Sequence, residues 1–180
     1  LYEEGIPGIA RIDTRSLAKK LRVHGVMMGA LEVSEDAVDA DGLKEALISA
    51  EAYGKQHFVK QVSCTTPTLY GEGGKTLALL DCGVKNGIVR HLLERGFTVQ
   101  RLPYDTPVDK VLSYGPQGVV VSNGPGDPKV CTETISTVAA LLEAGVPILG
   151  ICLGVQIVAL ALGGQTYKLK FGHRGQNKPC

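Results

Sequence analysis

The fold of this chain is decided in residues 76–102, which read TLALLDCGVKNGIVRHLLERGFTVQRL. Residues 76–80 form a nearly continuous apolar run, which is typical of a strand buried on both faces. Residues 85–95 have the spacing of an amphipathic helix, Gly96 ends it, and residues 97–102 favour a second strand. A strand, a helix and a second strand in this order predict two parallel strands joined by a crossover helix.

The same alternation continues toward the C-terminus. Two further strands and two further helices are predicted in the order 118–122, 132–144, 146–151 and 155–162. This pattern predicts an α/β fold in which helices cover both faces of a parallel sheet. Ligands bind beyond the carboxyl ends of the strands in such sheets, so we expect a site in the loops 123–128 and 151–154.

The preceding residues are predicted to be part of a smaller α/β domain in residues 1–59. Asp13 can cap a helix over residues 15–24, residues 26–33 favour a strand, and Asp41 can cap a second helix. After this domain, the sequence KQVSCTTPTLYGEGGK is rich in Gly, Thr and Pro. It indicates a linker over residues 60–75, followed by the larger domain in residues 76–180.

Composition disfavours several classes of protein. A net charge of +1 gives no electrostatic basis for binding nucleic acid or an anionic membrane. Residues 145–164 carry no charge, but their glycines, Pro147 and Gln156 favour a buried strand followed by a buried helix over a membrane span. Five irregularly spaced cysteines argue against a disulfide framework or a structural metal and favour a reducing, cytoplasmic setting.

The strongest local signal is Gly150-Ile151-Cys152-Leu153-Gly154, at a predicted strand-to-helix junction. A lone cysteine is ordinarily a small buried hydrophobe. Here, however, the two glycines fit a turn so sharp that side chains at their positions would collide, as in the G-x-S-x-G nucleophile elbow. The helix N-terminus favours a thiolate, and the N–H of Leu153 can stabilise an oxyanion nearby. The pattern therefore predicts that Cys152 is a nucleophile.

Two other features leave alternatives open. Residues 124–128, GPGDP, form either a rigid turn or a loop whose glycine amides approach a ligand closely. A cysteine nucleophile also needs a base. Of the four histidines, His173 is the best local candidate, although an exposed loop histidine without this role fits the sequence better.

Five segments together resemble the glutamine amidotransferase subunits of carbamoyl phosphate synthetases. They run in order along the chain and read GIPGIARIDTR (5–15), LLDCGVK (79–85), SNGPGDP (122–128), GICLG (150–154) and KFGHRGQN (170–177). The first segment separates this family from other class I amidotransferases, which share the elbow but lack IDTR.

The resemblance implies hydrolysis of L-glutamine. Cys152 attacks the side-chain amide, ammonia leaves, and water releases glutamate from the thioester. The family pattern implies that the amides of Gly124 and Leu153 form the oxyanion hole. It also implies that Gly124, Gly126, Leu153 and Gln156 line the glutamine site, with no cofactor or metal in this subunit.

The resemblance further implies a partner, the large synthetase subunit. This subunit receives ammonia through a tunnel and uses bicarbonate, ATP and Mg to make carbamoyl phosphate for arginine or pyrimidine biosynthesis. Two alternatives stay open: a class I amidotransferase subunit of another synthase, and a non-catalytic regulatory or assembly subunit.

The chain departs from the family pattern at two points. Val155 stands where the family usually has histidine, and we expect this to alter packing or substrate affinity rather than the chemistry. The family's catalytic histidine and glutamate lie beyond Cys180, and a glutamine-binding serine lies before Leu1, so the amidotransferase domain is expected to be C-terminally incomplete. His173 corresponds to a non-catalytic position, which removes it as a candidate base.

Overall fold

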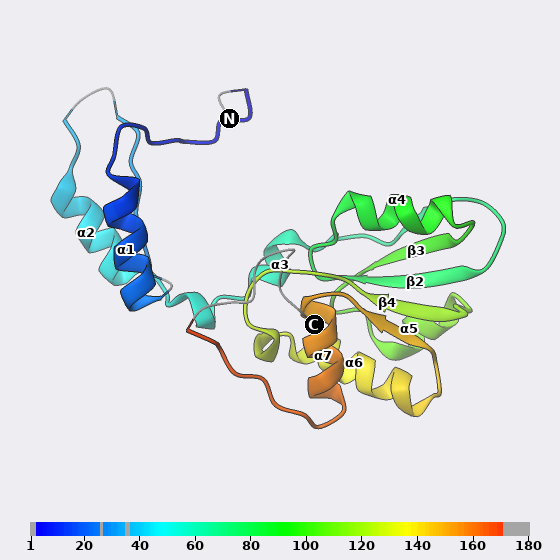
Figure 1. The fold of residues 1–180 in the computed structure, drawn as a ribbon. Helices are drawn as coiled ribbons and strands as arrows, with labels where there is room; N and C mark the ends of the chain where they lie inside the picture. Colours follow the sequence, from blue (N-terminus) through cyan, green and yellow to red (C-terminus); the bar gives the residue numbers. More distant parts are fainter. Residues whose placement is uncertain (1–2, 26, 35–36, 171–180) are drawn as a thin grey trace. The chain divides into compact units, whose positions relative to one another are not determined.

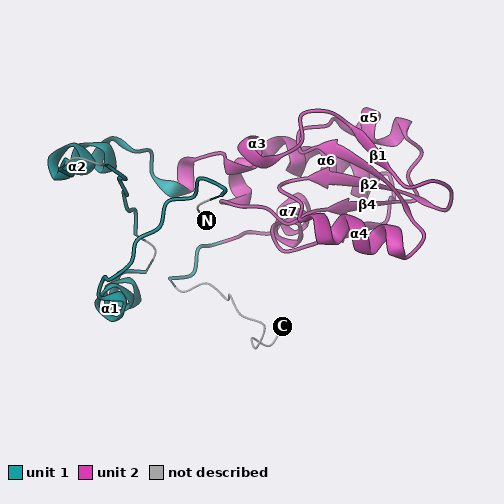
Figure 2. Cartoon of the chain, turned by 90° about the horizontal axis from the view of Figure 1, so that it is seen from above, with its two compact units in different colours: residues 1–53, 167–180 teal, residues 54–166 magenta. Residues whose placement is uncertain are grey.

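The computed structural model describes residues 3–25, 27–34 and 37–170. The chain divides into two compact units (Figures 1 and 2). The first unit comprises residues 1–53 and 167–180, and the second comprises residues 54–166.

One sheet forms the centre of the second unit. Its strands are β1 (Thr68–Tyr70), β2 (Thr76–Asp81), β3 (Thr98–Pro103), β4 (Gly118–Val121) and β5 (Ile148–Gly150). They lie in the order β1-β3-β2-β4-β5. Neighbours among β3, β2, β4 and β5 are parallel, whereas β1 runs antiparallel to β3 at one edge. The predicted parallel sheet is thus confirmed, with an antiparallel edge strand in addition.

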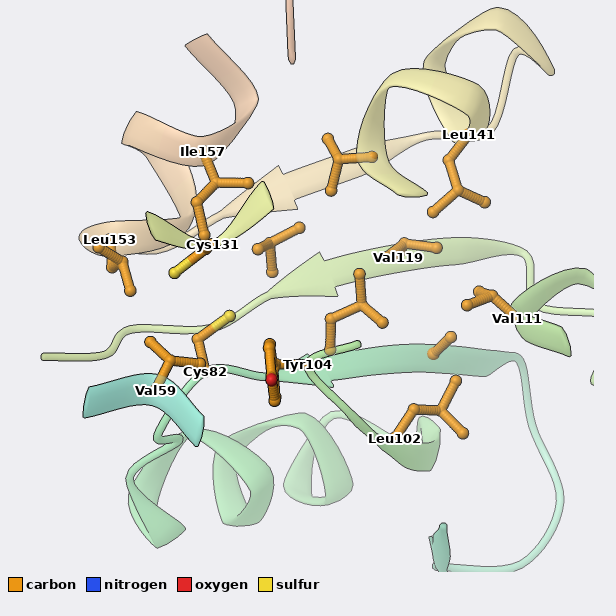
Figure 3. Close-up of a cluster of buried hydrophobic side chains, with 14 residues drawn as sticks. Val59, Cys82, Leu102, Tyr104, Val111, Val119, Cys131, Leu141, Leu153 and Ile157 are labelled. Atoms are coloured by element: carbon orange, nitrogen blue, oxygen red, sulfur yellow. The ribbon is translucent and has the colours of Figure 1, made fainter. Parts of the chain in front are cut away.

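Helices cover both faces of this sheet (Figure 1). They are α3 (Phe58–Val62), α4 (Asn86–Glu94), α5 (Val108–Ser113), α6 (Thr132–Glu143) and α7 (Leu153–Ala161). The chain also forms two short 3-10 turns, η1 (Tyr53–Lys55) at the boundary between the two units and η2 (Pro128–Val130). Because successive side chains of a strand point to opposite faces, β2 contributes to two hydrophobic clusters. Ala78 and Leu80 pack with residues of α5, α6 and α7, whereas Leu79 packs with Val89 of α4. Figure 3 shows the larger cluster.

Most elements of the second unit form close to their predicted bounds, and the exceptions are short. The strand β1 lies within residues 60–75, whose composition indicates a linker. The helix α3 overlaps the beginning of the same segment. The helix α5 has only six residues and was not predicted. The uncharged segment 145–164 forms β5 and α7, as predicted, and no described helix is long and apolar enough to cross a membrane.

The first unit contains the helices α1 (Thr14–His24) and α2 (Ala40–Ser49). Asp13 caps α1 as predicted, since its Oδ1 accepts the N–H of Ser16 at 2.8 Å. Neither helix contains a buried residue.

Two predictions for this unit are wrong. Asp39 caps α2 in place of Asp41, because it directly precedes the helix and accepts the N–H of Gly42 at 2.9 Å. Asp41 lies in the first turn and binds Lys44. The strand predicted over residues 26–33 does not form in residues 27–33, and Val26 lies outside the described residues.

Candidate active site

Cys152 lies at the turn between β5 and α7, at the carboxyl end of the parallel strands. Its backbone angles are φ 54° and ψ −107°, and Arg11 is the other described residue, glycines aside, with a positive φ. A residue with a Cβ atom rarely adopts this conformation, which is strained and persists only where its surroundings enforce it. The backbone therefore makes the sharp turn that a nucleophile elbow requires.

Gly150 and Gly154 make this turn possible because there is no space for a side chain at either position. A Cβ atom on Gly150 would lie 2.7 Å from the backbone nitrogen of Val155. A Cβ atom on Gly154 would lie 2.1 Å from the carbonyl oxygen of Val121, at the end of β4. Both obstacles are backbone atoms, so the two glycines are needed for close approach of the chain to itself.

Cys152 differs from the other described cysteines in its exposure, since its side chain alone among them is exposed. Burial raises the pKa of Cys82 to about 12, with a further contribution from Cys131, and burial raises the pKa of Cys131 to about 11. Burial and the neighbouring Asp81 raise the pKa of Cys64 to about 11. Figure 3 shows Cys82 and Cys131 inside the hydrophobic cluster, where thiols are inert.

The loop after β4 packs directly against the elbow. A Cβ atom on Gly124 would lie 2.1 Å from the carbonyl oxygen of Cys82 and 2.7 Å from Cδ2 of Leu153, the first residue of α7. The backbone of Gly124 thus lies close to the side chain of Leu153, the residue that follows Cys152. Gly126 lies further along the loop, with a φ of 90°, and faces Phe58 of α3.

The amides of Gly124 and Leu153 are available as hydrogen-bond donors. Among the residues that the structure describes, neither N–H is bonded to an acceptor. For Leu153 this follows from its position, because the first N–H groups of a helix have no partner within it. Unpaired backbone N–H groups are the kind of donor that can stabilise a tetrahedral oxyanion.

The remaining candidate residues lie on or beyond α7. Gln156 follows Cys152 by four residues, one helical turn away, and is exposed. Val155 is also exposed, at 55%, so its side chain is not part of the core. His173 lies outside the described residues, and no group of side chains able to hold a metal ion occurs in the described part of the chain.

Sequence reasoning does not single out Asp81, a fully buried carboxylate at the end of β2. Its Oδ1 accepts the N–H groups of Gly83 and Val84 at 2.9 and 2.7 Å. Its Oδ2 accepts the N–H of Cys64 at 2.8 Å and two bonds from Arg101, at 2.8 and 2.5 Å. Burial alone raises the pKa of Asp81, but these hydrogen bonds outweigh burial and hold the pKa below its ordinary value.

Ser122 and Asn123, at the end of β4, were likewise not identified as separate functional residues. The Ser122 Oγ accepts the N–H of Cys82 at 2.9 Å, and Asn123 Nδ2 donates to the carbonyl of Gly83 at 2.9 Å. These bonds join the loop that carries Gly124 to the loop that Asp81 holds. A polar residue directly after a continuous apolar strand is the sequence signal that marks both Asp81 and Ser122.

The fold and this arrangement of loops define a class of protein. Residues 78–180 match the family described as glutamine amidotransferase class-I. The chain belongs to this family.

The chain is also similar to individual proteins named carbamoyl phosphate synthase small chain. The chain is 45% identical to that of Methanopyrus kandleri, over 99% of this chain and 50% of the relative. It is 43% and 41% identical to those of Sulfurisphaera tokodaii and Sulfolobus acidocaldarius, over 99% of this chain and 47% of each relative. The chain thus spans about half the length of the curated relatives it matches.

Proposed function

We propose that the protein to which this chain belongs hydrolyses glutamine as the small subunit of a carbamoyl phosphate synthase. The observation that carries this proposal is the exposed Cys152 in a strained elbow, beside the unpaired amides of Gly124 and Leu153. Membership of the class-I family and the names of the relatives support it.

The chemistry follows from these groups. The sulfur of Cys152 forms a bond to the side-chain carboxamide carbon of glutamine, and the amide oxygen becomes an oxyanion. The N–H groups of Gly124 and Leu153 stabilise this charge in the transition state. The carbon–nitrogen bond then breaks, nitrogen leaves as ammonia after accepting a proton, and water cleaves the thioester to give glutamate. The base that accepts the thiol proton is one that the family resemblance places after Cys180.

Substrate binding and use of the ammonia complete the proposal. Gly126 and Gln156 line the glutamine site together with the oxyanion donors. The ammonia passes to a large synthetase subunit, which supplies the ATP-dependent steps of carbamoyl phosphate synthesis. The relatives' designation as small chains supports a partner of this kind.

Substitution of the nucleophile tests this function in the full-length protein bound to its partner. We expect Cys152→Ser to abolish glutaminase activity, because a serine hydroxyl at this elbow is a much weaker nucleophile than a thiolate. Synthesis driven by added ammonia is the control, and it should be retained because it does not use Cys152. Glutaminase activity that survives the substitution would contradict the assignment of the nucleophile.

Two experiments separate this proposal from its alternatives, namely identification of the protein that co-purifies with the full-length chain and chemical labelling of the Cys152 thiol. Co-purification with an ATP-dependent carbamoyl phosphate synthetase supports the proposal, whereas a different synthase contradicts it. Alkylation of Cys152 by a glutamine-like chloroketone supports a catalytic subunit, and an inert Cys152 in the intact protein would indicate a regulatory or assembly role.

A further inference from the structure

Ser122 occupies a buried position between β4 and the loop that carries Gly124. The residue has no exposed surface, and its hydroxyl makes two hydrogen bonds. The Oγ accepts the N–H of Cys82 at 2.9 Å and donates to the carbonyl oxygen of Asn123 at 2.8 Å. Because its proton and a lone pair are both in use, the hydroxyl cannot rotate without breaking one of these bonds.

The carbonyl that Ser122 binds belongs to the same peptide group as the N–H of Gly124. A trans peptide is planar, so its carbonyl and its N–H point in opposite directions, and no described peptide bond is cis. The hydrogen bond from Ser122 to the Asn123 oxygen therefore also sets the direction of the Gly124 N–H. Without it, this peptide can rotate more freely, because glycine permits many backbone conformations.

The side chain of Asn123 attaches the residue before Gly124 to the loop after β2. Its Nδ2 donates to the carbonyl of Gly83 at 2.9 Å, and its Oδ1 accepts the N–H of Lys85 at 3.3 Å. The loop that receives these bonds is itself held by Asp81 through the amides of Gly83 and Val84. The Asn123 backbone thus has a rigid support, and the Ser122 hydroxyl determines how the next peptide is turned on that support.

We propose that Ser122 is a positioning residue for glutamine hydrolysis, which orients the Asn123–Gly124 peptide so that the Gly124 N–H faces the oxyanion formed at Cys152. The inference rests on the proposed function and deepens it. Ser122 acts through this peptide group and does not touch the substrate. Since the oxyanion exists only after attack, the loss of this orientation raises the barrier of the reaction without weakening the binding of glutamine.

The test compares wild-type full-length protein, bound to its partner, with Ser122→Ala. Loss of an oxyanion donor costs about 100- to 1,000-fold in kcat in other enzymes, and here the donor is retained but less fixed, so we expect a fall of about 10- to 100-fold. We expect KM for glutamine to stay within about twofold. Alkylation of Cys152 by iodoacetamide should keep its wild-type rate, because that reaction forms no oxyanion and reports only on the thiol and its elbow.

A second buried hydroxyl supplies the matched control. Thr137 in α6 donates to the carbonyl of Thr106 at 3.0 Å, and this bond involves no residue of the candidate active site. We expect both Thr137→Val and Ser122→Ala to lower the melting temperature, and only Ser122→Ala to lower kcat.

Two outcomes would overturn the inference. One is an unchanged kcat in Ser122→Ala. The other is a fall in kcat accompanied by slower alkylation of Cys152 in the same variant, or by an equal fall in the kcat of Thr137→Val. A wild-type protein that does not hydrolyse glutamine would instead contradict the proposed function itself, so the two failures are distinguishable.

Discussion

The two loops that meet beside Cys152 are held in place by different forces. The elbow is held by its backbone, because Gly150 and Gly154 leave no space between the chain and itself. The loop after β4 is held by side chains, through the hydrogen bonds of Ser122 and Asn123. The elbow is therefore sensitive to added atoms, whereas the second loop is sensitive to the loss of polar atoms.

The largest expected effect comes from adding one methyl group to the elbow. Gly154→Ala places a Cβ atom 2.1 Å from the Val121 carbonyl oxygen, so α7 must move away from β4. We expect glutaminase activity to be lost and the free energy of unfolding to fall by about 1–3 kcal/mol, as in other overpacked sites. Glutaminase assays and urea unfolding measure the two effects.

Gly87→Ala in α4 is the control for this substitution. No atom lies within 4 Å of a Cβ at Gly87, and alanine favours the helix, so neither stability nor activity should fall. Full activity in Gly154→Ala would show that backbone packing does not hold the elbow.

An intermediate effect is expected at Asp81, whose charge holds the loop after β2, to which the loop after β4 is bonded. Asp81→Asn leaves the Arg101 guanidinium without its carboxylate. Removing one partner of a fully buried pair costs about 3–5 kcal/mol, and because Arg101 is 22% exposed we expect about 2 kcal/mol in the free energy of unfolding at pH 7. Asp105→Asn, at an exposed position, should change it by less than about 0.5 kcal/mol.

The same carboxylate predicts a dependence of stability on pH. Because the pKa of Asp81 is lower in the folded protein than its ordinary value of about 4, its contribution to stability is complete above that pH. The contribution is lost as the pH falls through the lower, folded-state pKa. Urea unfolding between pH 7 and pH 2 should therefore show a smaller loss of stability in Asp81→Asn than in the wild type, and parallel curves would contradict this role.

The smallest effect is expected from an exposed side chain next to the elbow. Val155 is 55% exposed, so Val155→His should change the free energy of unfolding by less than about 0.5 kcal/mol. We expect a change in KM for glutamine with kcat retained, since the position lies beside the elbow but supplies no oxyanion donor. A large rise in kcat in steady-state assays would show instead that valine impairs the chemistry.

The parts of the fold that could be predicted are those that local sequence determines. The strands β2 and β4 are continuous apolar runs. In a sequence where strands alternate with helices, such runs are typical of strands buried on both faces of a parallel sheet. The strand β1 has three residues, with Leu69 exposed, and it exists through its pairing with β3. Residues 27–33 have a strand-like composition but form no strand.

The candidate site divides in the same way. The elbow could be predicted because its glycines and its cysteine lie within five consecutive residues. The bond between Ser122 and Cys82 joins residues 40 positions apart, and it forms because β2 and β4 are neighbours in the sheet. Strand order is a property of the whole fold, so composition and spacing alone do not reveal this bond.

The order of strands in the sheet also determines when the elbow can form during synthesis. A chain is made from its N-terminus, so the strands of a sheet become available in sequence order. The strands β1, β2 and β3 are made first, β4 then pairs beside β2, and β5 follows beside β4. The N–H of Ile151 binds the Val121 carbonyl at 2.9 Å, and Gly154 packs on the same group, so β4 is the template for the elbow. The strained turn at Cys152 can therefore form only once β4 is in place, since both β5 and the residue before Cys152 are bonded to that strand.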